Sequence, residues 1–210
     1  MNEVVLYDYW RSSASYRVRI ALNMLGIGYR TVPINLLEGE HKKPDYLALN
    51  PQGLVPTFVI DGRTLTQSLS IIEYLAETWP ESGLLPRDPA GRQQVRALAY
   101  AIAMDIHPIC NMHVVAEVMT LTGKADAREE WMRHFISDGL SKLEVMLGEF
   151  DGAFSFGDRP TMADFCLVPQ VYNARRWGVD LTELNRIVDI DGKCAELPAF
   201  QAAHPDRVRS

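Results

Sequence analysis

A cluster of hydroxyls and guanidiniums near the start of the chain is the segment best suited to chemistry. It comprises three serines and three arginines that lie close together: Arg11, Ser12, Ser13, Ser15, Arg17 and Arg19. Serine hydroxyls donate hydrogen bonds to anions, and guanidiniums stay positively charged. Where such residues open a helix, unpaired N–H groups and the helix dipole also favour a negative ligand. The segment therefore predicts a site for an anion or a thiolate, unless Ser12 or Ser13 serves only as the helix cap.

The residues on either side of this cluster predict a strand followed by a helix. Residues 4–7 form a short apolar run. After the cluster, apolar residues recur with the spacing of a buried helix face, at Val18, Ala21, Leu22 and Leu25. We therefore expect the cluster to lie at a strand-to-helix junction.

Length, composition and charge restrict the class of protein. With 210 residues, 47% of them hydrophobic, the chain is long enough for one or two globular domains with packed cores. A formal net charge of −6 argues against nucleic acid or an anionic membrane as a partner, so any anion site must be local. The chain has no apolar run of the ~20 residues that a membrane helix needs and no basic-then-apolar leader, so we expect a cytoplasmic protein. Cys110, Cys166 and Cys194 are too scattered to predict a disulfide framework or a metal site.

Residues 1–80 alternate strand and helix signals in the order of an α/β thioredoxin-like domain. After the first strand and helix we expect a strand at 29–34, a helical piece at 44–49, strands at 57–60 and 63–65, and a helix at 68–78. Pro33 predicts an edge strand, and Asp61-Gly62 predicts a hairpin turn. Val55-Pro56 occupies the place of the proline that this fold uses beside its ligand. A cis peptide there would turn the Val55 main chain outward, to pair with a peptide-like ligand.

The second half of the chain reads as an all-α domain. Residues 81–91 are rich in proline and glycine and predict a linker, and residues 92–210 form the helical domain. We expect a long helix at 92–119 that is kinked by Pro108, and a second helix at 127–150. Thr161 and Asp164 have the spacing of a capping box that opens a third helix, which Pro169 should bend.

Taken together, these segments resemble the zeta class of glutathione transferases over nearly the whole chain. The matching segments are 11–22, Asn50-Pro51, Val55-Pro56, Gln67-Ser68, 71–75, 162–164, 167–171 and 179–182. The resemblance implies a thioredoxin-like domain followed by an all-helical domain, a homodimer, and an active site near the cleft between the domains.

The resemblance also implies glutathione as the cofactor. Ser12 would donate a hydrogen bond to the thiol sulfur and so stabilise the thiolate. Gln67 and Ser68 resemble the pair that binds the γ-glutamyl group, Val55 would pair with the cysteinyl main chain, and His41 lies where the family contacts the glycyl end. The other implied glutathione-binding residues are Ser13, Ser15, Arg17, His107, Asn111 and His113. For Ser68, His41, His107 and Asn111, an ordinary structural role is the alternative.

The implied reaction is cis–trans isomerisation of a diketo acid, maleylacetoacetate, to fumarylacetoacetate in aromatic-acid catabolism. A thiolate adds to the cis double bond, the bond rotates and the thiolate leaves, so glutathione is regenerated. Arg11 and Arg176 are the candidates for binding the substrate carboxylate and the developing oxyanion, and Arg175 is the less favoured neighbour.

One departure from the family concerns Ala14, where zeta enzymes usually carry cysteine, so no protein thiol is expected to be essential. The alternatives are a maleylpyruvate isomerase, a general transferase acting on electrophiles or α-haloacids, and a binding module without turnover. Met112 and His113 replace arginines of the maleylpyruvate enzymes and weaken that alternative. Retention of Ser12, Gln67 and Ser68 together disfavours the binding module.

Overall fold

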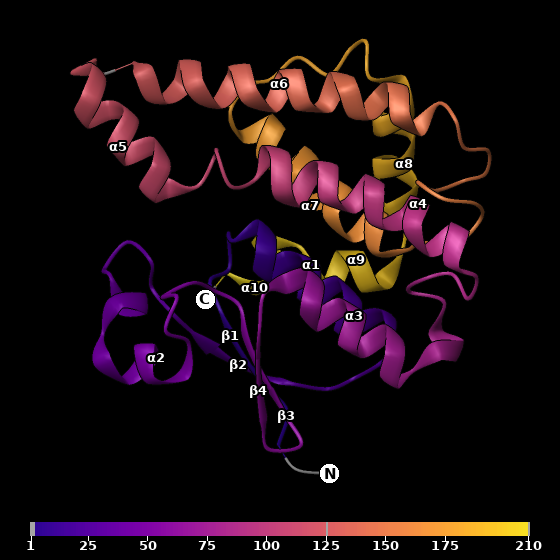
Figure 1. The fold of residues 1–210 in the computed structure, drawn as a ribbon, viewed down its shortest axis with the longest axis horizontal. Coiled ribbons are helices and arrows are strands. Elements are labelled where there is room, and N and C mark those ends of the chain that lie inside the picture. The colour runs from indigo at the N-terminus through magenta and orange to yellow at the C-terminus, as the bar shows by residue number, and fades with distance from the viewer. Residues whose placement is uncertain (1–2, 125, 210) are drawn as a thin grey trace. The chain divides into compact units, whose positions relative to one another are not determined.

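The computed structural model describes residues 3–124 and 126–209, which form two compact units (Figure 1). One unit comprises residues 1–85 and 195–210, and the other comprises residues 86–194. The sequence predicted a boundary in the linker at 81–91, close to this division. It assigned the last residues of the chain to the helical domain, whereas in the structure they pack with the first unit.

The first unit is built on a four-stranded sheet with the order β2-β1-β3-β4. The strands are β1 (Val5–Asp8), β2 (Arg30–Pro33), β3 (Thr57–Ile60) and β4 (Arg63–Thr66). β1 pairs parallel with β2 and antiparallel with β3, and β3 pairs antiparallel with β4, as the thioredoxin-like prediction requires. Pro33 lies on an edge strand, where its missing N–H does not cost the sheet a hydrogen bond. Asp61 and Gly62 both have positive φ, which matches a tight hairpin turn.

Helices of this unit bury apolar faces on the same core. They are α1 (Ser13–Met24), α2 (Pro44–Leu49), α3 (Ser68–Thr78), α9 (Pro198–Ala203) and α10 (Pro205–Val208), with short 3₁₀ turns at Glu40–Lys42 and Pro80–Ser82. Ile20 on α1 and Ile72 on α3 are completely buried, as is Phe58 on β3. The predicted bounds of α2 and α3 agree with the structure.

A buried ion pair joins the C-terminal segment to this unit. Arg19 donates from Nη1 to both carboxylate oxygens of Asp8, at 2.7 and 2.8 Å. The same guanidinium donates to the carbonyl oxygens of Trp10, at 2.9 Å, and Ala203, at 3.0 Å. Asn23 on α1 also donates to the carbonyl of Ala199. The carbonyls of Ala199 and Ala203 thus bind side chains of α1, which explains why the C-terminal segment belongs to the first unit.

The second unit is helical. Its helices are α4 (Pro89–Tyr100), a π-helical segment (Ala101–Ile106), α5 (Met112–Thr122), α6 (Ala127–Leu147), α7 (Met162–Arg176) and α8 (Asn185–Ala195). The expectation of one kinked helix over 92–119 was wrong, because residues 107–111 form turns and a bend that separate the π-helical segment from α5. Pro108 lacks an N–H, and Asn111 has an extended backbone (φ −71°, ψ 147°) that begins α5 anew. The capping box of Thr161 and Asp164 is confirmed, and α7 continues through Pro169.

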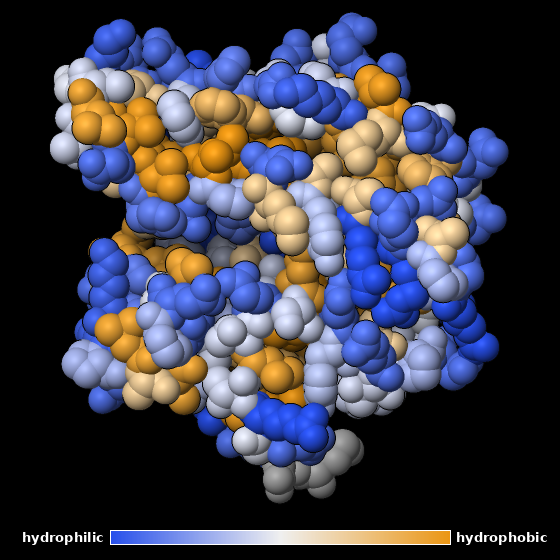
Figure 2. Space-filling model, viewed as in Figure 1, coloured by the Kyte–Doolittle hydropathy of each residue, from blue (hydrophilic) through white to orange (hydrophobic). Residues whose placement is uncertain are grey.

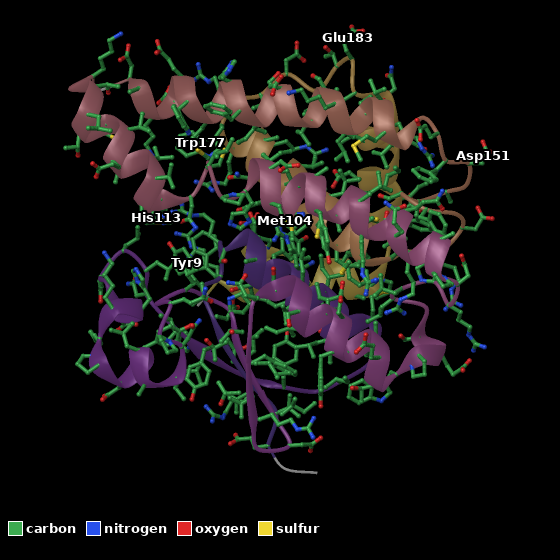
Figure 3. The ribbon with its side chains drawn as sticks, viewed as in Figure 1. Tyr9, Met104, His113, Asp151, Trp177 and Glu183 are labelled. Atoms are coloured by element: carbon green, nitrogen blue, oxygen red, sulfur yellow. The ribbon has the colours of Figure 1, made fainter. Side chains whose placement is uncertain are left out.

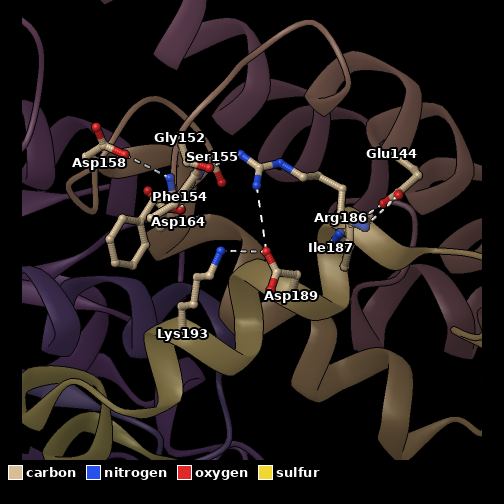
Figure 4. A network of polar contacts seen from close by, with 11 residues as sticks. Glu144, Gly152, Phe154, Ser155, Asp158, Asp164, Arg186, Ile187, Asp189 and Lys193 are labelled. Carbon is tan, nitrogen blue, oxygen red and sulfur yellow. Dashed lines mark hydrogen bonds and ion pairs between the residues drawn. The ribbon is translucent and has the colours of Figure 1, made fainter.

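A network of polar contacts fastens α8 to its neighbours (Figure 4). The Glu144 carboxylate on α6 accepts from the main-chain N–H groups of Arg186, at 2.7 Å, and Ile187, at 2.9 Å. These N–H groups open α8 and would otherwise lack partners, so Glu144 acts as a cap from another helix. The Arg186 guanidinium donates to the carbonyls of Gly152 and Phe154 at 2.8 Å each. The loop between α6 and α7 is thereby held in place.

On the face drawn in Figure 2, polar side chains are interspersed with apolar ones, several of which are exposed around α5. Leu121 is 77% exposed and Met112 44% exposed, and Val115 is the residue of α5 that is buried. Within residues 3–124 and 126–209, every helix is too short or too polar to cross a membrane.

Candidate active site

Ser12 is the cap of α1 and keeps a hydrogen to donate. Its backbone is extended (φ −69°, ψ 121°), and its Oγ accepts from the N–H of Ser15 at 3.2 Å. This bond occupies one lone pair of the hydroxyl and leaves its O–H free to donate elsewhere. The side chain is partly exposed, so a ligand can reach it. Ser12 can therefore cap the helix and bind an anion at the same time. The capping bond fixes the position of the hydroxyl from which it would donate to the anion.

Arg11 and Ser13 flank this hydroxyl in the chain and are also partly exposed. The guanidinium of Arg11 lies over the Trp10 ring, 5.2 Å from its centroid. This cation–π contact holds the positive charge beside the N-terminus of α1 without neutralising it, since the ring carries no net charge.

Two of the predicted glutathione-binding side chains face inward. Ser15 is completely buried, and its Oγ has no hydrogen-bond partner among the described residues. A hydroxyl so placed does not reach a surface ligand, so we assign the Ser15 side chain to the core, contrary to the expectation from sequence. Arg17 is 2% exposed and donates from Nη1 to Ser68 Oγ at 3.3 Å. Its effect on a ligand is thus indirect, through the position of Ser68 at the start of α3.

Gln67 has an unusual backbone conformation immediately before α3. Its φ is +66° and its ψ is 109°, a region that residues other than glycine rarely adopt. Its exposed side chain donates from Nε2 to Oε1 of Gln52 at 2.9 Å. Strained backbone of this kind persists where the surroundings require it, often at binding sites. Here it lies at a helix N-terminus, where a carboxylate would be favoured.

The Val55-Pro56 peptide is cis, as the sequence predicted. The preceding loop is held by Asn50 Nδ2 and Tyr46 Oη, which both donate to the carbonyl of Leu54, at 2.7 and 2.6 Å. The side chain of Val55 packs in a cluster that includes Tyr46. Its main-chain N–H and C=O have no partner among the described residues. A fixed, unpaired main chain of this kind is suited to pairing with an extended peptide.

His41 lies in the 3₁₀ turn before α2. Its Nδ1 is buried and unpaired within the described part of the chain. Burial, and to a lesser extent the positive charge of Lys42, lower the pKa of the imidazole below its ordinary value. The ring is therefore neutral at physiological pH, and one of its nitrogens carries a hydrogen that it can donate.

The remaining candidates lie in the second unit. His107 ends the π-helical segment and Asn111 precedes α5, so both belong to the interruption around Pro108. His113 is exposed in the first turn of α5 (Figure 3). Arg176 is exposed at the end of α7 and donates to Asn173 Oδ1 at 3.3 Å. Arg175 is paired with Asp191 of α8 at 2.6 Å.

None of the three cysteines is placed for catalysis. Cys166 and Cys194 are buried, and Cys110 is partly exposed. Burial raises the pKa of the Cys110 thiol to about 11, and burial with nearby carboxylates raises that of Cys194 still further. These two thiols are protonated at neutral pH, so neither is suited to act as a nucleophile.

Sequence reasoning missed some of the residues that shape these sites. Gln52 orients the Gln67 amide, and no local pattern joins two exposed amides fifteen positions apart. The contact of the Arg128 guanidinium with the Trp177 ring likewise exists only because α6 packs beside the end of α7. Neither pairing has a signature that can be read along the chain.

Comparison with known proteins identifies the two domains of a glutathione S-transferase. The model of the glutathione S-transferase N-terminal domain matches residues 2–77, and that of the C-terminal domain matches residues 125–203. The chain is 63% identical to maleylacetoacetate isomerase of Rhizobium meliloti, over 99% of each chain.

Solved structures agree with this assignment. A holo maleylpyruvate isomerase, described as a bacterial glutathione S-transferase of the zeta class, superposes with a TM-score of 0.94 at 44% identity, covering 98% of this chain and 99% of the other. Maleylacetoacetate isomerase of Anaeromyxobacter dehalogenans, solved with glutathione bound in its active site, superposes with a TM-score of 0.89 at 43% identity, covering 99% and 97%. The chain therefore belongs to the glutathione S-transferase family, in the zeta-class group that contains the maleylacetoacetate and maleylpyruvate isomerases.

Proposed function

We propose that this protein is a glutathione-dependent isomerase that converts maleylacetoacetate to fumarylacetoacetate. The observation that carries the proposal is the 63% identity, over 99% of both chains, with the maleylacetoacetate isomerase of Rhizobium meliloti. The geometry of the first unit supports it, because a capped helix, a cis-proline loop and a strained residue before α3 together offer what an acidic thiol peptide needs.

The groups of the first unit fit glutathione in both charge and type. The N-terminus of α3, with Gln67 and Ser68, suits the γ-glutamyl carboxylate. The unpaired main chain of Val55 suits the peptide bonds, and the neutral His41 can donate to the glycyl carboxylate. The O–H of Ser12 is left for the sulfur. Ser13 and Arg17 would support this site, and His107, Asn111 and His113 are our candidates for contacts from the second unit.

Glutathione, when bound, supplies the thiolate that adds reversibly to the cis double bond of the substrate and so permits rotation about it. Ser12 donates a hydrogen bond that favours the charged sulfur over the thiol. The N-terminus of α1 acts in the same direction, since its unpaired N–H groups stabilise negative charge. Both effects lower the pKa of the bound thiol toward neutrality without any protein base.

Arg11 and Arg176 are the residues we assign to the substrate. Negative charge develops on a carbonyl oxygen as the thiolate adds, and a guanidinium that is already charged and oriented stabilises it. A guanidinium can also bind a carboxylate through two parallel hydrogen bonds. Arg11 is oriented by the Trp10 ring, and Arg176 by Asn173 and the Trp177 ring.

The decisive experiment measures isomerisation and thiol consumption together. Maleylacetoacetate is mixed with the enzyme and a small, substoichiometric amount of glutathione, and the absorbance of the diketo acid is followed while free thiol is titrated. An isomerase turns over many substrate molecules per glutathione and leaves the thiol concentration unchanged. A general transferase consumes one thiol per substrate molecule, and that result would reject the proposal.

Maleylpyruvate is the alternative substrate, and the superposition on a maleylpyruvate isomerase at a TM-score of 0.94 favours considering it. The two substrates differ by one methylene next to a carboxylate. A higher kcat/KM for maleylacetoacetate than for maleylpyruvate supports the assignment. A higher kcat/KM for maleylpyruvate would identify the protein as a maleylpyruvate isomerase.

We also propose that the enzyme is a cytoplasmic homodimer. Family membership supports the dimer, and the composition together with the lack of a membrane-spanning helix among the described residues fits the cytoplasm. Light scattering during gel filtration tests the assembly: a mass near 23.7 kDa would indicate a monomer and refute the dimer.

A further inference from the structure

The indole ring of Trp10 contacts two guanidiniums that come from distant parts of the chain. Arg11, its neighbour in the sequence, lies over the ring at 5.2 Å from the centroid. Arg209, in the C-terminal segment, lies over the same ring at 4.9 Å. Such contacts are attractive, because the face of an indole ring carries partial negative charge. One aromatic ring thus connects the C-terminal segment to the residue that precedes Ser12.

Buried contacts fix the main chain that carries this ring. The carbonyl of Trp10 accepts from Nη2 of Arg19 at 2.9 Å, and the Arg19 side chain is completely buried. The N–H of Ser12 donates to the carbonyl of Tyr9 at 2.8 Å and closes a four-residue turn, whose two central residues are Trp10 and Arg11. The Trp10 ring is partly buried and packs against the hydrophobic cluster of Tyr9. The ring therefore has a defined position beside the N-terminus of α1.

The same buried guanidinium also fixes the segment that carries Arg209. Nε of Arg19 donates to the carbonyl of Ala203 at 3.0 Å. The short helix α10 then continues to Val208, and Arg209 follows it. Because Arg19 binds both the Trp10 carbonyl and the C-terminal segment, the approach of Arg209 to the ring follows from buried contacts.

The ring is also the contact that orients Arg11. The Arg11 side chain is partly exposed, and no carboxylate pairs with it within residues 3–124 and 126–209. A long side chain without an ion pair samples several rotamers, and a contact that favours one of them reduces that freedom. Arg209 limits the choice further, because it contacts the same ring and because two positive charges repel each other. The Arg11 guanidinium is thereby kept on the part of the ring that Arg209 leaves free.

We propose that Arg209 is a positioning residue for the diketo acid site, which holds the Trp10 ring and confines the guanidinium of Arg11. This inference rests on the proposed function, in which Arg11 stabilises negative charge on the substrate. It gives the C-terminal segment a part in turnover as well as in the packing of α1. Orientation before the reaction matters, because a charged group that is already in place stabilises the transition state without rearrangement.

Two other roles of Arg209 predict different results. If Arg209 only fastens the C-terminal segment, its loss lowers stability and leaves the kinetics with the diketo acid unchanged. If Arg209 contacts the substrate itself, its loss impairs turnover whether or not Arg11 is present. A positioning residue acts through Arg11, so its loss has no effect once Arg11 has been removed.

The kinetic experiment is a double-mutant cycle of Arg209→Gln and Arg11→Gln, with Arg207→Gln as the matched control. Arg207 is exposed in α10, and none of the described residues pairs with its side chain. In Arg209→Gln we expect kcat/KM for maleylacetoacetate to fall about threefold to fivefold, which corresponds to one exposed cation–π contact. In the Arg11→Gln background the same substitution should leave kcat/KM unchanged.

Further variants separate the role of the charge from that of the fold. KM for glutathione should stay within about twofold of wild type in Arg209→Gln, and Arg207→Gln should match wild type throughout. Arg209→Lys should recover part of the loss, because it keeps a cation over the ring. An unchanged kcat/KM in Arg209→Gln, or equal losses with and without Arg11, would overturn the proposal.

Nuclear magnetic resonance of the Arg11 side chain tests the positioning apart from catalysis. The heteronuclear NOE of Arg11 Nε reports how freely the side chain moves, and Arg11→Lys identifies its signal. We expect this NOE to fall in Arg209→Gln and to keep its wild-type value in Arg207→Gln. If the NOE does not change in Arg209→Gln, Arg209 does not position Arg11. If wild type fails to isomerise the diketo acid and the NOE still falls, the proposed function is wrong and the positioning of Arg11 stands.

Discussion

At the scale of single residues, Ser12 combines a structural bond with the chemical role that we propose for it. The N–H of Ser15 donates to its Oγ, and this contact fixes the side chain while leaving its hydrogen for a sulfur. In Ser12→Ala we expect kcat to fall about a hundredfold, by comparison with the loss of one donor to a developing negative charge elsewhere. KM for glutathione should change little, because the rest of the peptide is held by other groups. Steady-state kinetics with each substrate varied in turn measures both effects.

The same variant also removes a helix cap, at a cost of about 1 kcal/mol in the free energy of unfolding. Ser12→Thr retains both the cap and the O–H and serves as the control. A pH titration of the ultraviolet absorbance of bound thiolate reports the pKa of the glutathione thiol directly. That pKa should rise in Ser12→Ala and stay near the wild-type value in Ser12→Thr. An unchanged pKa in Ser12→Ala would exclude Ser12 from activating the sulfur.

Cys110 gives a prediction about pH. Burial raises the pKa of its thiol to about 11, so the thiolate fraction at pH 8 is far below that of a free cysteine. We expect alkylation of Cys110 by iodoacetamide at pH 8 to be about a hundredfold slower than that of a cysteine peptide, and to accelerate as the pH rises toward 11. Mass spectrometry of the alkylated residue against time gives the rate. Rapid labelling at pH 8 would mean that the thiol is more accessible and more acidic than its surroundings imply.

The variant Cys110→Ala follows from the same reasoning. Since the reactive sulfur comes from glutathione, kcat and both KM values should stay within about twofold of wild type. Loss of turnover in Cys110→Ala, with the melting temperature retained, would indicate that a protein thiol takes part after all.

At the scale of elements, local signals predicted most of the sheet and the helices that hold the site. The hairpin at Asp61-Gly62 and the opening of α7 at Thr161 follow from short-range rules about turns and caps, which is why they were predictable. The interruption between α4 and α5 was not, because Pro108 alone predicts a kink and a π-helical segment has no distinct sequence pattern. The positive φ of Gln67 was also beyond prediction, since residues of its type rarely adopt it.

The capping box of α7 should prove sensitive to the loss of charge. Asp164 is completely buried, and its carboxylate accepts from the N–H groups of Thr161, at 2.7 Å, and Ser155, at 2.8 Å. In Asp164→Asn one acceptor is replaced by an NH₂ group that faces a donor, so we expect a loss of about 2–4 kcal/mol in the free energy of unfolding. Urea denaturation followed by circular dichroism measures it. Wild-type stability in Asp164→Asn would show that the carboxylate does not hold α7.

At the scale of the whole molecule, long-range pairing decides which residues belong to which unit. Arg19 lies in the first helix beside residues that were predicted to bind an anion. Its sequence context did not distinguish it from those candidate ligand-binding residues. In the structure it is completely buried and paired with Asp8, so its charge serves the fold. Sequence patterns identified the helical character of the C-terminal residues but could not say that they return to the first unit, because the carbonyls of Ala199 and Ala203 that fix them look like any others.

Breaking this ion pair should destabilise the first unit strongly. In Asp8→Asn the Arg19 guanidinium stays buried without a full counter-charge, so we expect a loss of about 3–5 kcal/mol in the free energy of unfolding. The exposed pair of Arg30 and Glu3 provides a comparison, since water screens it and Glu3→Gln should therefore cost far less than Asp8→Asn. Thermal and urea denaturation of both variants give the two values. An equal loss of unfolding free energy in the two variants would contradict the role of the buried pair of Asp8 and Arg19 in stabilising the first unit.

Removal of residues 195–210 tests the division into units most directly. Those residues supply two carbonyls to α1 side chains, place the Arg209 guanidinium 4.9 Å from the centroid of the Trp10 ring, and set His204 edge-on against Tyr16. Without them the Arg19 guanidinium loses an acceptor and the face of α1 is exposed to water, so hydrogen exchange should accelerate in β1 and α1. The amides of α4, α6 and α7 should keep their protection, because their packing lies within residues 86–194. Uniform acceleration in both units would instead mean that the chain opens as one cooperative body, in which the C-terminal segment stabilises the whole and not the first unit alone.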